Sequence, residues 1–456
     1  MKLKLLLLLT VLPMLVSAQE IVFKSMRSDE DYSSFGKLAD SSWYHRFKFH
    51  PLSSDKLNYI SFGGEVRNQY FHYKDQDWGQ SLPDRDGFVL ARTLFHADLH
   101  LGKSFRTFVQ LQSSMSNGEL ESPSPVNKNP LDLHQAFIDF TQPIGRVSLL
   151  TFRIGRQELS YGSQRLVSLR EAPNNRQAFD GGKMIYSTER LRVEGFYTNY
   201  VQARAGIFDD RITADTRFWG TYATVKRFPL LKNIDLYYLG IKKRKAVFDD
   251  GAAGELRHSV GLRTWNTDRQ WQYDIEGVYQ FGHFGQHKIA AWTLSSNVAY
   301  TFTDIYLSPQ LGLKTEAISG DRRYGDGKLN TFNPLFPKGG YFGLAALIGP
   351  SNLFDIHPYL QISLSKKLTL MEDYDVFWRM QTSDGIYAVN TRLLYSGKNT
   401  LSRYIGGQLG TNLEYNPTNS LYLRAEFTWF KSGDYLMEVG PGKDILMSGA
   451  TITYKF

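Results

Sequence analysis

The feature of this sequence that most constrains its fold is a two-residue alternation of apolar and polar side chains, repeated along most of the chain. Such alternation predicts β-strands with one apolar and one polar face. In the segment 88 to 102, Val89, Phe95 and Leu101 share one face and Arg92 lies on the other. The polar faces carry too much charge for the core of a water-soluble sandwich. They suit the wall of a water-filled barrel, because in lipid only a closed barrel pairs every backbone NH and carbonyl group.

Alternation bounded by turn residues predicts eighteen strands. They occupy residues 59 to 74, 88 to 102, 105 to 116, 132 to 141, 147 to 157, 181 to 188, 190 to 201, 216 to 228, 232 to 245, 255 to 266, 269 to 282, 287 to 303, 304 to 318, 353 to 366, 369 to 382, 402 to 416, 418 to 432 and 446 to 456. The predicted fold class is all-β, a transmembrane antiparallel β-barrel of about 18 strands.

The links between these strands alternate in length. Links at 102 to 104, 267 to 268, 303 to 304, 365 to 367 and 416 to 419 are short, whereas those at 117 to 131, 158 to 180, 202 to 215, 319 to 352 and 433 to 445 are long and polar. Outer-membrane barrels have short periplasmic turns and long outer loops. An even number of strands also places both ends of the barrel on the periplasmic side.

The two ends of the chain support the same localisation. The first residues have two lysines, an apolar run from Leu5 to Val16, and the small residues Ser17 and Ala18. This layout predicts a signal peptide over 1 to 18 that is cleaved after Ala18, since the run is shorter than the roughly 20 residues of a membrane-spanning helix. A polar periplasmic extension or plug is expected over 19 to 57, and the barrel over 58 to 456. The last strand alternates regularly and ends on Phe456, as outer-membrane barrels do.

Composition limits the possible chemistry and partners. The chain has no cysteine, which excludes disulfides and thiolate metal sites. Its formal charge of +8 is spread along the chain rather than gathered into a run, and nucleic acid is not an expected partner behind a secretion signal. We expect no cofactor and no metal site, and the lipid bilayer of the outer membrane as the chain's surroundings.

Several segments together resemble the alginate export family of outer-membrane proteins. The most specific is RIGRQELSYGSQRLVSLREAPNNRQAFDGGKM at 153 to 184, supported by RSDEDY at 27 to 32, FGGEVRNQY at 62 to 70, NPLFPKGGYFG at 333 to 343 and LEYN at 413 to 416. The resemblance implies an eighteen-stranded monomeric barrel whose electropositive lumen passes a polyuronate or a related anionic solute. The solute need not be alginate, because a fold can serve several substrates.

Arginine is the residue type best suited to such a path, because its planar fork matches a carboxylate in two-point contact. Strand parity and the long loop after residue 157 select the candidate pore residues. They are Arg67, Arg92, Arg106, Arg153, Arg156, Arg165, Arg170, Arg176, Arg192, Arg257, Arg263, Lys314, Arg379, Arg403 and Arg424, together with Asp180. Asp180 is interpreted either as a partner of Arg176 or another lumen arginine, or as a turn residue before Gly181.

The same parity places many carboxylates in the lumen, so its charge is mixed. They are Glu65, Asp98, Asp139, Glu194, Asp274, Glu276, Glu316, Asp375, Glu414 and Glu426. For any single arginine, a cross-strand ion pair that stabilises the wall is therefore an alternative to a role in selectivity. The pairs Asp209-Asp210 and Asp249-Asp250 are predicted in outer loops, as solvated loop tips or as calcium ligands, although no EF-hand spacing is present.

The predicted function is an outer-membrane channel for anionic polysaccharide or related polar solutes, by passive transport or by export with periplasmic partners. Two transport alternatives stay open: a specific uptake porin for acidic sugars and a general diffusion porin. An outer-membrane hydrolase is a further alternative, but the sequence has no GxSxG or HExxH motif, and His96, His100, His134, His258 and His357 are scattered. The chain is therefore predicted not to be an enzyme.

Overall fold

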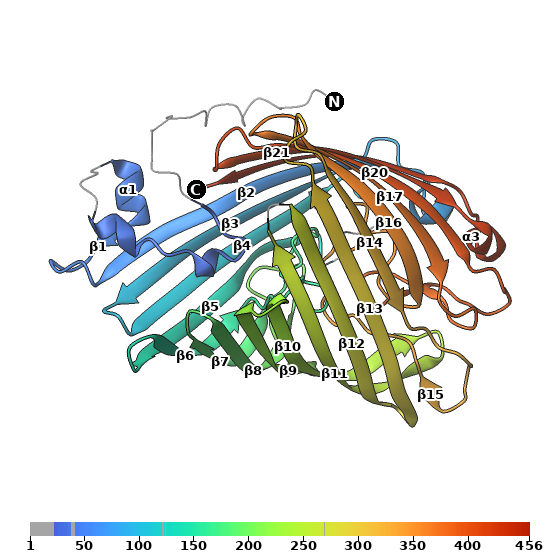
Figure 1. Cartoon of the computed structure of the whole chain (residues 1–456), viewed down its shortest axis with the longest axis horizontal. Coiled ribbons are helices and arrows are strands. Elements are labelled where there is room, and N and C mark those ends of the chain that lie inside the picture. The colour runs from blue at the N-terminus through green and yellow to red at the C-terminus, as the bar shows by residue number, and fades with distance from the viewer. Residues whose placement is uncertain (1–21, 38–41, 121–122, 124, 269) are drawn as a thin grey trace.

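The computed structural model describes residues 22–37, 42–120, 123, 125–268 and 270–456, which form a closed antiparallel barrel (Figure 1). Its eighteen strands are β2 (Tyr59–Lys74), β3 (Phe88–Leu101), β4 (Phe105–Asn117), β5 (Asn129–Ile144), β6 (Ser148–Gln157), β7 (Phe179–Ser187), β8 (Leu191–Gln202), β9 (Arg211–Phe228), β10 (Lys232–Phe248), β11 (Gly251–Thr267), β12 (Trp271–Phe284), β13 (His287–Thr301), β14 (Gln310–Ile318), β16 (Leu353–Ser363), β17 (Leu368–Arg379), β20 (Tyr404–Tyr415), β21 (Leu421–Ser432) and β22 (Ile445–Lys455). The predicted fold class is confirmed. The predicted signal peptide, with its cleavage after Ala18, lies outside the described residues.

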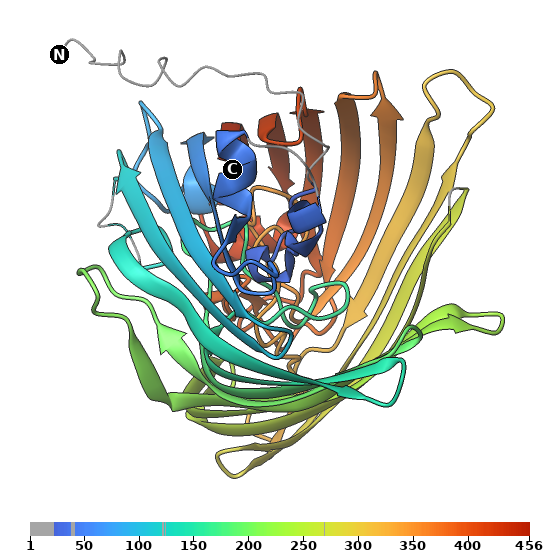
Figure 2. The ribbon, with the colours of Figure 1, turned by 90° about the vertical axis from the view of Figure 1, so that its left-hand side faces the viewer.

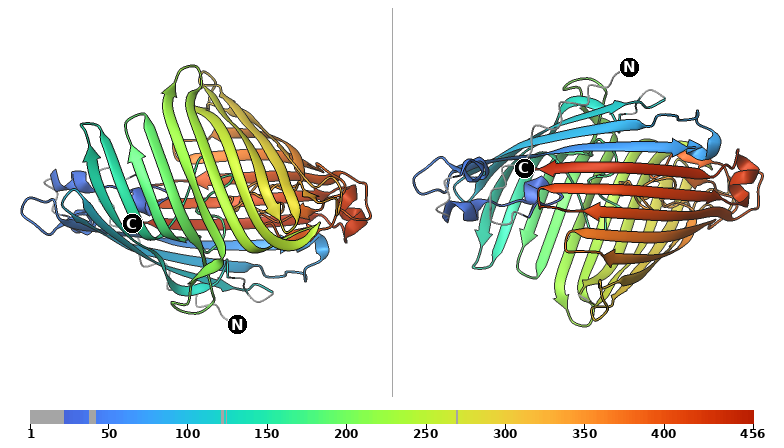
Figure 3. Two further views of the ribbon diagram at one scale, coloured as in Figure 1. Left: turned by 90° about the horizontal axis from the view of Figure 1, so that it is seen from below. Right: turned by 90° about the horizontal axis from the view of Figure 1, so that it is seen from above.

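The first and last strands of the barrel close it. β2 pairs with β3 on one side and with β22 on the other, so that Glu65 lies opposite both Leu94 and Lys455. Figure 3 shows the blue and red strands of the two chain ends side by side in one wall. Closure leaves no unpaired sheet edge, as a barrel in lipid requires.

The predicted alternation within strands is confirmed by the exposure of the side chains. On β3, Val89, Phe95 and Leu101 are exposed on the outer surface, whereas Arg92 and Asp98 are buried inside. An apolar outer face is what a lipid environment favours, and a charged inner face needs water or ionic partners.

Short turns and long loops alternate around the barrel, and two links depart from prediction. The loop predicted at 202 to 215 spans only 203–210, because β9 begins at Arg211. The predicted turn at 303 to 304 is wrong, because β13 ends at Thr301 and β14 begins only at Gln310. Residues 302–309 form a wider turn in which the Phe302 NH donates to the Pro309 carbonyl at 2.9 Å, and Leu307 and Ser308 have positive φ angles of 67° and 42°. A left-handed backbone cannot continue a strand.

The remaining elements are short. They are the 3-10 helices η1 (Arg27–Asp29) and η2 (Ser33–Lys37), the helices α1 (Trp43–Lys48), α2 (Gln76–Gly79) and α3 (Asp434–Val439), and the strands β1 (His50–Pro51), β15 (Lys328–Leu329), β18 (Ile386–Tyr387) and β19 (Leu393–Tyr395). Among the described residues, none of the helices combines the length and the hydropathy needed to cross a membrane.

The barrel encloses chain segments that are not part of its wall. In Figure 2, which faces one end of the barrel, the N-terminal segment and several loops lie within the ring of strands. The Arg27 side chain is buried there and donates to the carbonyls of Gly64 at 2.8 Å and Phe456 at 3.1 Å. A large apolar cluster joins the inner wall to the loops 158–178 and 319–352, including Val167, Phe336 and Phe218.

Candidate functional site

The loop 158–178, which joins β6 to β7 and is called the pore loop below, is held to one side of the barrel by ion pairs. The carboxylate of Glu171 accepts a hydrogen bond from Arg92 on β3 and lies 2.5 Å from Arg176 of the loop itself. Arg67 on β2 donates to the Glu171 carbonyl at 2.7 Å. Partial burial alone would raise the pKa of Glu171, but Arg176, Arg92 and Arg67 together hold it well below its usual range.

The same loop is held to the opposite wall by Arg165. Its guanidinium lies 3.1 Å from Asp274 and 3.3 Å from Glu276, both on β12, and 3.1 Å from Glu316 on β14. The Tyr341 hydroxyl also donates to Glu316 at 2.9 Å. The pore loop therefore extends across the lumen between two anchors on strands far apart in the barrel.

A second loop, 319–352, called the lid loop below, pairs with the pore loop inside the barrel. The Ser168 NH donates to the Phe336 carbonyl, and the Phe336 NH donates to the Leu166 carbonyl, both at 2.9 Å. The Phe336 ring lies 5.0 Å from the rings of both Phe179 and Phe218 on the wall. Backbone pairing and aromatic packing thus join the two loops to each other and to the wall.

The two loops separate an outer from an inner cavity. The outer cavity, of about 780 Å³, is lined by Arg170 of the pore loop and by Pro337 and Gly339 of the lid loop. The inner cavity, of about 130 Å³, is lined by Arg165 and by Lys338. Residues 335–342 therefore form a partition with one side toward each cavity, and this partition is the candidate constriction of a pore.

The charges around the outer cavity differ in their partners. Its basic side chains are Arg170, Lys243 and Arg392, and its acidic ones are Asp77, Asp84 and Glu119. Asp84 accepts hydrogen bonds from two backbone NH groups of its own loop, Asp77 from Ser81, and Glu119 from Ser116 and Asn127. The guanidinium of Arg170 donates only to the neutral groups of Gln177 at 2.7 Å and Tyr200 at 3.2 Å in the described structure.

The predicted pore arginines lie mostly in ion pairs. Those with a carboxylate within 4 Å are Arg67, Arg92, Arg106, Arg153, Arg156, Arg165, Arg176, Arg192, Arg257, Arg263 and Arg424. Within the described part of the chain, Arg170, Lys314, Arg379 and Arg403 form no such pair. Arg379 is buried and donates instead to backbone carbonyls, including that of Ser402 at 3.0 Å.

Asp180 pairs with another predicted pore arginine, Arg156, rather than with Arg176. Asp180 lies within β7, whose strand continues through Gly181, so the prediction of a turn residue is wrong. Arg156 donates to both of its oxygens, at 2.9 and 3.1 Å, whereas Arg176 pairs with Glu158 and Glu171. Asp180 thus joins neighbouring strands.

The two acidic pairs of the outer loops also have defined contacts. Asp249 accepts hydrogen bonds from Ser396 and from the Gly397 NH, both at 2.7 Å, and Asp250 accepts from the Gly325 NH at 2.7 Å. They therefore join β10 and β11 to the loops 380–403 and 319–352. Asp209 and Asp210 lie beside Asp132, with ligand-type oxygens within 4.8 Å of one another.

Several residues of this site were not among the predicted ones. Glu171, Lys338, Lys243 and Arg392 lie at the anchors, the partition or the outer cavity. Glu171 and Lys338 lie in the segments 153 to 184 and 333 to 343, which carry the family resemblance. That resemblance is the sequence feature that could have identified them. Their positions depend on loop conformation, which strand alternation does not determine.

Comparison with known families agrees with this architecture. The family model described as alginate export matches residues 58–443. The chain belongs to the alginate export family. Together with the closed barrel of eighteen strands, this membership makes the protein an outer-membrane channel for solutes. No curated protein matches the chain.

Solved structures with the same fold include several porins. A BenF-like porin from Pseudomonas fluorescens Pf-5 has a TM-score of 0.60 at 11% identity, over 87% of this chain and 98% of that one. Pseudomonas aeruginosa OpdK with vanillate has a TM-score of 0.57 at 11% identity, over 87% and 98%. Pseudomonas aeruginosa OccK2 (OpdF) in complex with glucuronate has a TM-score of 0.54 at 12% identity, over 87% and 96%. At these identities the similarity shows the fold.

Proposed function

We propose that this channel passes anionic solutes, such as oligouronates or an anionic polysaccharide, along the basic side chains that face its two cavities. The observation that carries the proposal is the asymmetry of the outer cavity. Its carboxylates accept hydrogen bonds from groups of their own loops, whereas Arg170, Lys243 and Arg392 form no ion pair with any described carboxylate. A guanidinium with only neutral partners keeps most of its attraction for a passing anion.

The basic side chains continue through the partition. Lys338 lines the inner cavity beside Arg165, and Lys314 on β14 lines it as well. Burial and the neighbouring cations Arg165 and Lys314 lower the pKa of Lys338 to about 8, so most of it is still charged at pH 7. Arg165 is already paired with Asp274, Glu276 and Glu316, so Lys338 is the side chain of the partition whose charge stays available to a passing anion.

The paired arginines have a different role in this proposal. Arg153 makes two hydrogen bonds of 2.7 Å to Asp139, and its guanidinium stacks 3.7 Å from the centroid of the Phe137 ring. Such a guanidinium is already neutralised. We therefore propose selectivity at Arg170 and Lys338, with the paired arginines of the strands stabilising the wall.

Passage of a polymer requires the partition to move, since the pore loop and the lid loop are hydrogen-bonded to each other across the lumen. This observation favours a second candidate, uptake of small acidic sugars. The structurally similar OccK2 was solved in complex with glucuronate, a single acidic sugar. The size of the solute that blocks the current distinguishes the two.

The hydrolase alternative gains no support. Among the described residues, His134 contacts the carboxylate of Glu158 at 2.8 Å, and His357 contacts those of Asp375 and Asp373 at 2.9 and 3.2 Å. No hydrogen bond in that part of the chain joins a histidine ring to a serine hydroxyl, as a catalytic pair would need.

We also propose that residues 19 to 57 act as a periplasmic extension that partly enters the barrel. The carbonyls of Ser25 and Ser28 accept hydrogen bonds from Arg176 at 3.2 Å and Arg106 at 2.6 Å. An export partner in the periplasm would meet this segment first.

The test of the proposed function is single-channel recording in planar bilayers, with reversal potentials measured in a salt gradient. We expect anion selectivity, block by oligouronate, and a weaker block in R170Q and K338Q. K103Q, in the exposed turn between β3 and β4, is the matched control and should leave the block unchanged. Cation selectivity, or an equal block in R170Q and wild type, would contradict the proposal.

A further inference from the structure

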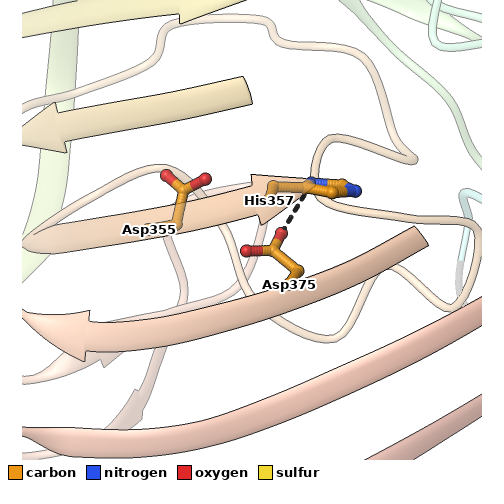
Figure 4. A group of neighbouring side chains, drawn as sticks. All are labelled: Asp355, His357 and Asp375. Carbon is orange, nitrogen blue, oxygen red and sulfur yellow. Dashed lines mark ion pairs between the residues drawn. The ribbon is translucent and has the colours of Figure 1, made fainter. Parts of the chain in front are cut away.

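Beyond solute passage, a cluster of buried acidic and imidazole groups occupies the inner wall where β16 meets β17. Asp355 and His357 stand two residues apart on β16 and so face the same side of the sheet. The register of β16 with β17 pairs Asp355 with Phe377 and Tyr359 with Asp373, which places His357 opposite Asp375. Figure 4 shows Asp355, His357 and Asp375 gathered on one face of the two strands.

The local backbone keeps these groups together. The strand pairing is recorded on both sides of His357 and Pro358 but not at these two residues. Proline has no NH to donate, which accounts for the interruption at this point of the ladder. The three side chains each bring one nitrogen or oxygen atom within 4.8 Å of the others.

The polar atoms of the cluster lack the partners that burial demands. Asp355 is 1% exposed and Asp375 0%, yet none of their four carboxylate oxygens accepts a hydrogen bond from any described residue. His357 Nδ1 lies 2.9 Å from Asp375 and Nε2 lies 3.2 Å from Asp373, but Nε2 makes no hydrogen bond. Buried carboxylates without hydrogen bonds are strongly unfavourable and call for a compensating cation.

The protein supplies only part of that charge. Facing the cluster are the carboxylates of Asp373 on β17 and Glu316 on β14, and the ammonium of Lys314, which lies opposite His357. Glu316 is already paired with Arg165 at 3.1 Å, and the Lys314 ammonium lies 4.9 Å from the centroid of the Tyr359 ring, without an ion pair in the described structure. Three aspartates against Lys314 and Lys338, which line the same cavity, leave a formal charge of −1 when His357 is neutral. A divalent cation would offset this charge and give the bare carboxylate oxygens a partner.

We propose that Asp355, His357 and Asp375 form a binding site for a divalent transition-metal cation of the Zn²⁺ class. One imidazole nitrogen with carboxylate oxygens is a donor set that such ions accept, whereas Ca²⁺ and Mg²⁺ prefer oxygen alone. Asp355 and His357 also line the inner cavity, which leaves room for water or a solute carboxylate on the metal. A bound cation would join β16 to β17 where their backbone pairing is interrupted.

The experiment is calorimetric titration of refolded, metal-free full-length protein with ZnCl₂, combined with metal analysis after dialysis. We expect one Zn²⁺ per chain bound at this cluster, and an affinity lower by about 100-fold or more in D355N and H357Q, since each removes a direct ligand. H258Q, on the lipid-facing side of β11, and D304N, in the turn after β13, are matched controls that should bind as wild type does.

Two further readouts keep the test decisive. Heat-modifiable migration on gels shows whether each variant forms the barrel, and the visible spectrum of the Co²⁺-loaded wild type reports nitrogen and oxygen coordination without any substitution. Absence of stoichiometric Zn²⁺ binding to the folded wild type would overturn the site. Unchanged Zn²⁺ affinity in folded D355N and H357Q would also overturn it, because the metal would then bind elsewhere, for example beside Asp132.

Discussion

Replacing Glu171 with glutamine removes a charge that three arginines share at one anchor of the pore loop. The partners Arg92 and Arg176 are 0% and 2% exposed at their side chains, whereas Glu171 itself is 48% exposed. Breaking a fully buried ion pair costs about 3 to 5 kcal/mol because a charge is left without a partner. Here the cost is smaller, because the carboxylate is half exposed to water and because Arg92 keeps Glu65 at 2.6 Å while Arg176 keeps Glu158 at 3.3 Å.

We therefore expect E171Q to weaken the anchored position of the pore loop by about 2 kcal/mol, within the usual range of hydrogen bonds to charged groups. That difference corresponds to a roughly 30-fold increase in the ratio of displaced to anchored loop. The second anchor, at Arg165, remains intact, so the barrel should still form. In planar bilayers, E171Q should show frequent transitions to states of higher conductance.

The matched control is E119Q, because Glu119 faces the outer cavity and accepts hydrogen bonds only from nearby neutral groups, those of Ser116 at the end of β4 and Asn127 of its own loop, in the described structure. E119Q should show the same single-channel currents as the wild type.

A change of pH gives a second control, because it tests whether the Glu171 carboxylate stays ionised. Since the pKa of Glu171 is held well below its usual range, its stabilising effect is present above that range and is lost only as pH falls through the lowered pKa. Lowering the pH from 7 to 5 should not reproduce the E171Q phenotype. Identical gating in E171Q and wild type would refute the anchoring role.

Three further predictions concern the lid loop and the wall. F336A removes the ring that packs on Phe179 and Phe218, so the packing of the lid loop should weaken by about 3 to 5 kcal/mol and the single-channel conductance should rise. Y324A, at an exposed position of the same loop, should have the same conductance as the wild type. Burial raises the pKa of Asp321 to about 7, so the protonated form stabilises the lid loop, and this stabilisation is lost as pH rises through 7. Opening of the lid loop should therefore be more frequent at pH 8 than at pH 5.5. D321N should remove this pH dependence. D139N leaves buried Arg153 without its carboxylate and should lower the free energy of unfolding by about 3 kcal/mol in urea titrations; an unchanged midpoint would contradict this.

The strands could be predicted from the sequence because each position in a barrel wall has only two environments, lipid or lumen. Val89 and Phe95 on one face of β3, with Arg92 and Asp98 on the other, identify both environments within one strand. The end of β13 could not be predicted in the same way. Thr303 and Asp304 resemble a tight turn in the sequence, but the pairing of β13 already ends at Thr301, and the positive φ angles of Leu307 and Ser308 keep residues 302–309 out of both strands.

Strand parity also predicts which charged side chains point inward, but it does not predict which of them lack an ion-pair partner and can attract a solute. Arg67 meets the Glu171 carbonyl 104 residues further along the chain, through a loop whose return into the barrel leaves no periodic signal. The same holds for Arg165, whose three carboxylate partners come from β12 and β14. Loop conformation therefore decides the electrostatics of this lumen.

Because the conformation of the loops decides which charges stay unpaired, the loops can determine solute selectivity in a lumen of mixed charge. A strand arginine such as Arg153 has its carboxylate partner fixed by register, because Asp139 lies directly opposite it on β5. Loop residues such as Arg170 and Lys338 have no register partner, and their charges face the two cavities beside the partition. Substitutions in the strands should then change mainly the stability of the wall, and substitutions in the two loops should change mainly the choice of solute. The loops could thus diverge toward a new solute without loss of the ion pairs that hold the barrel.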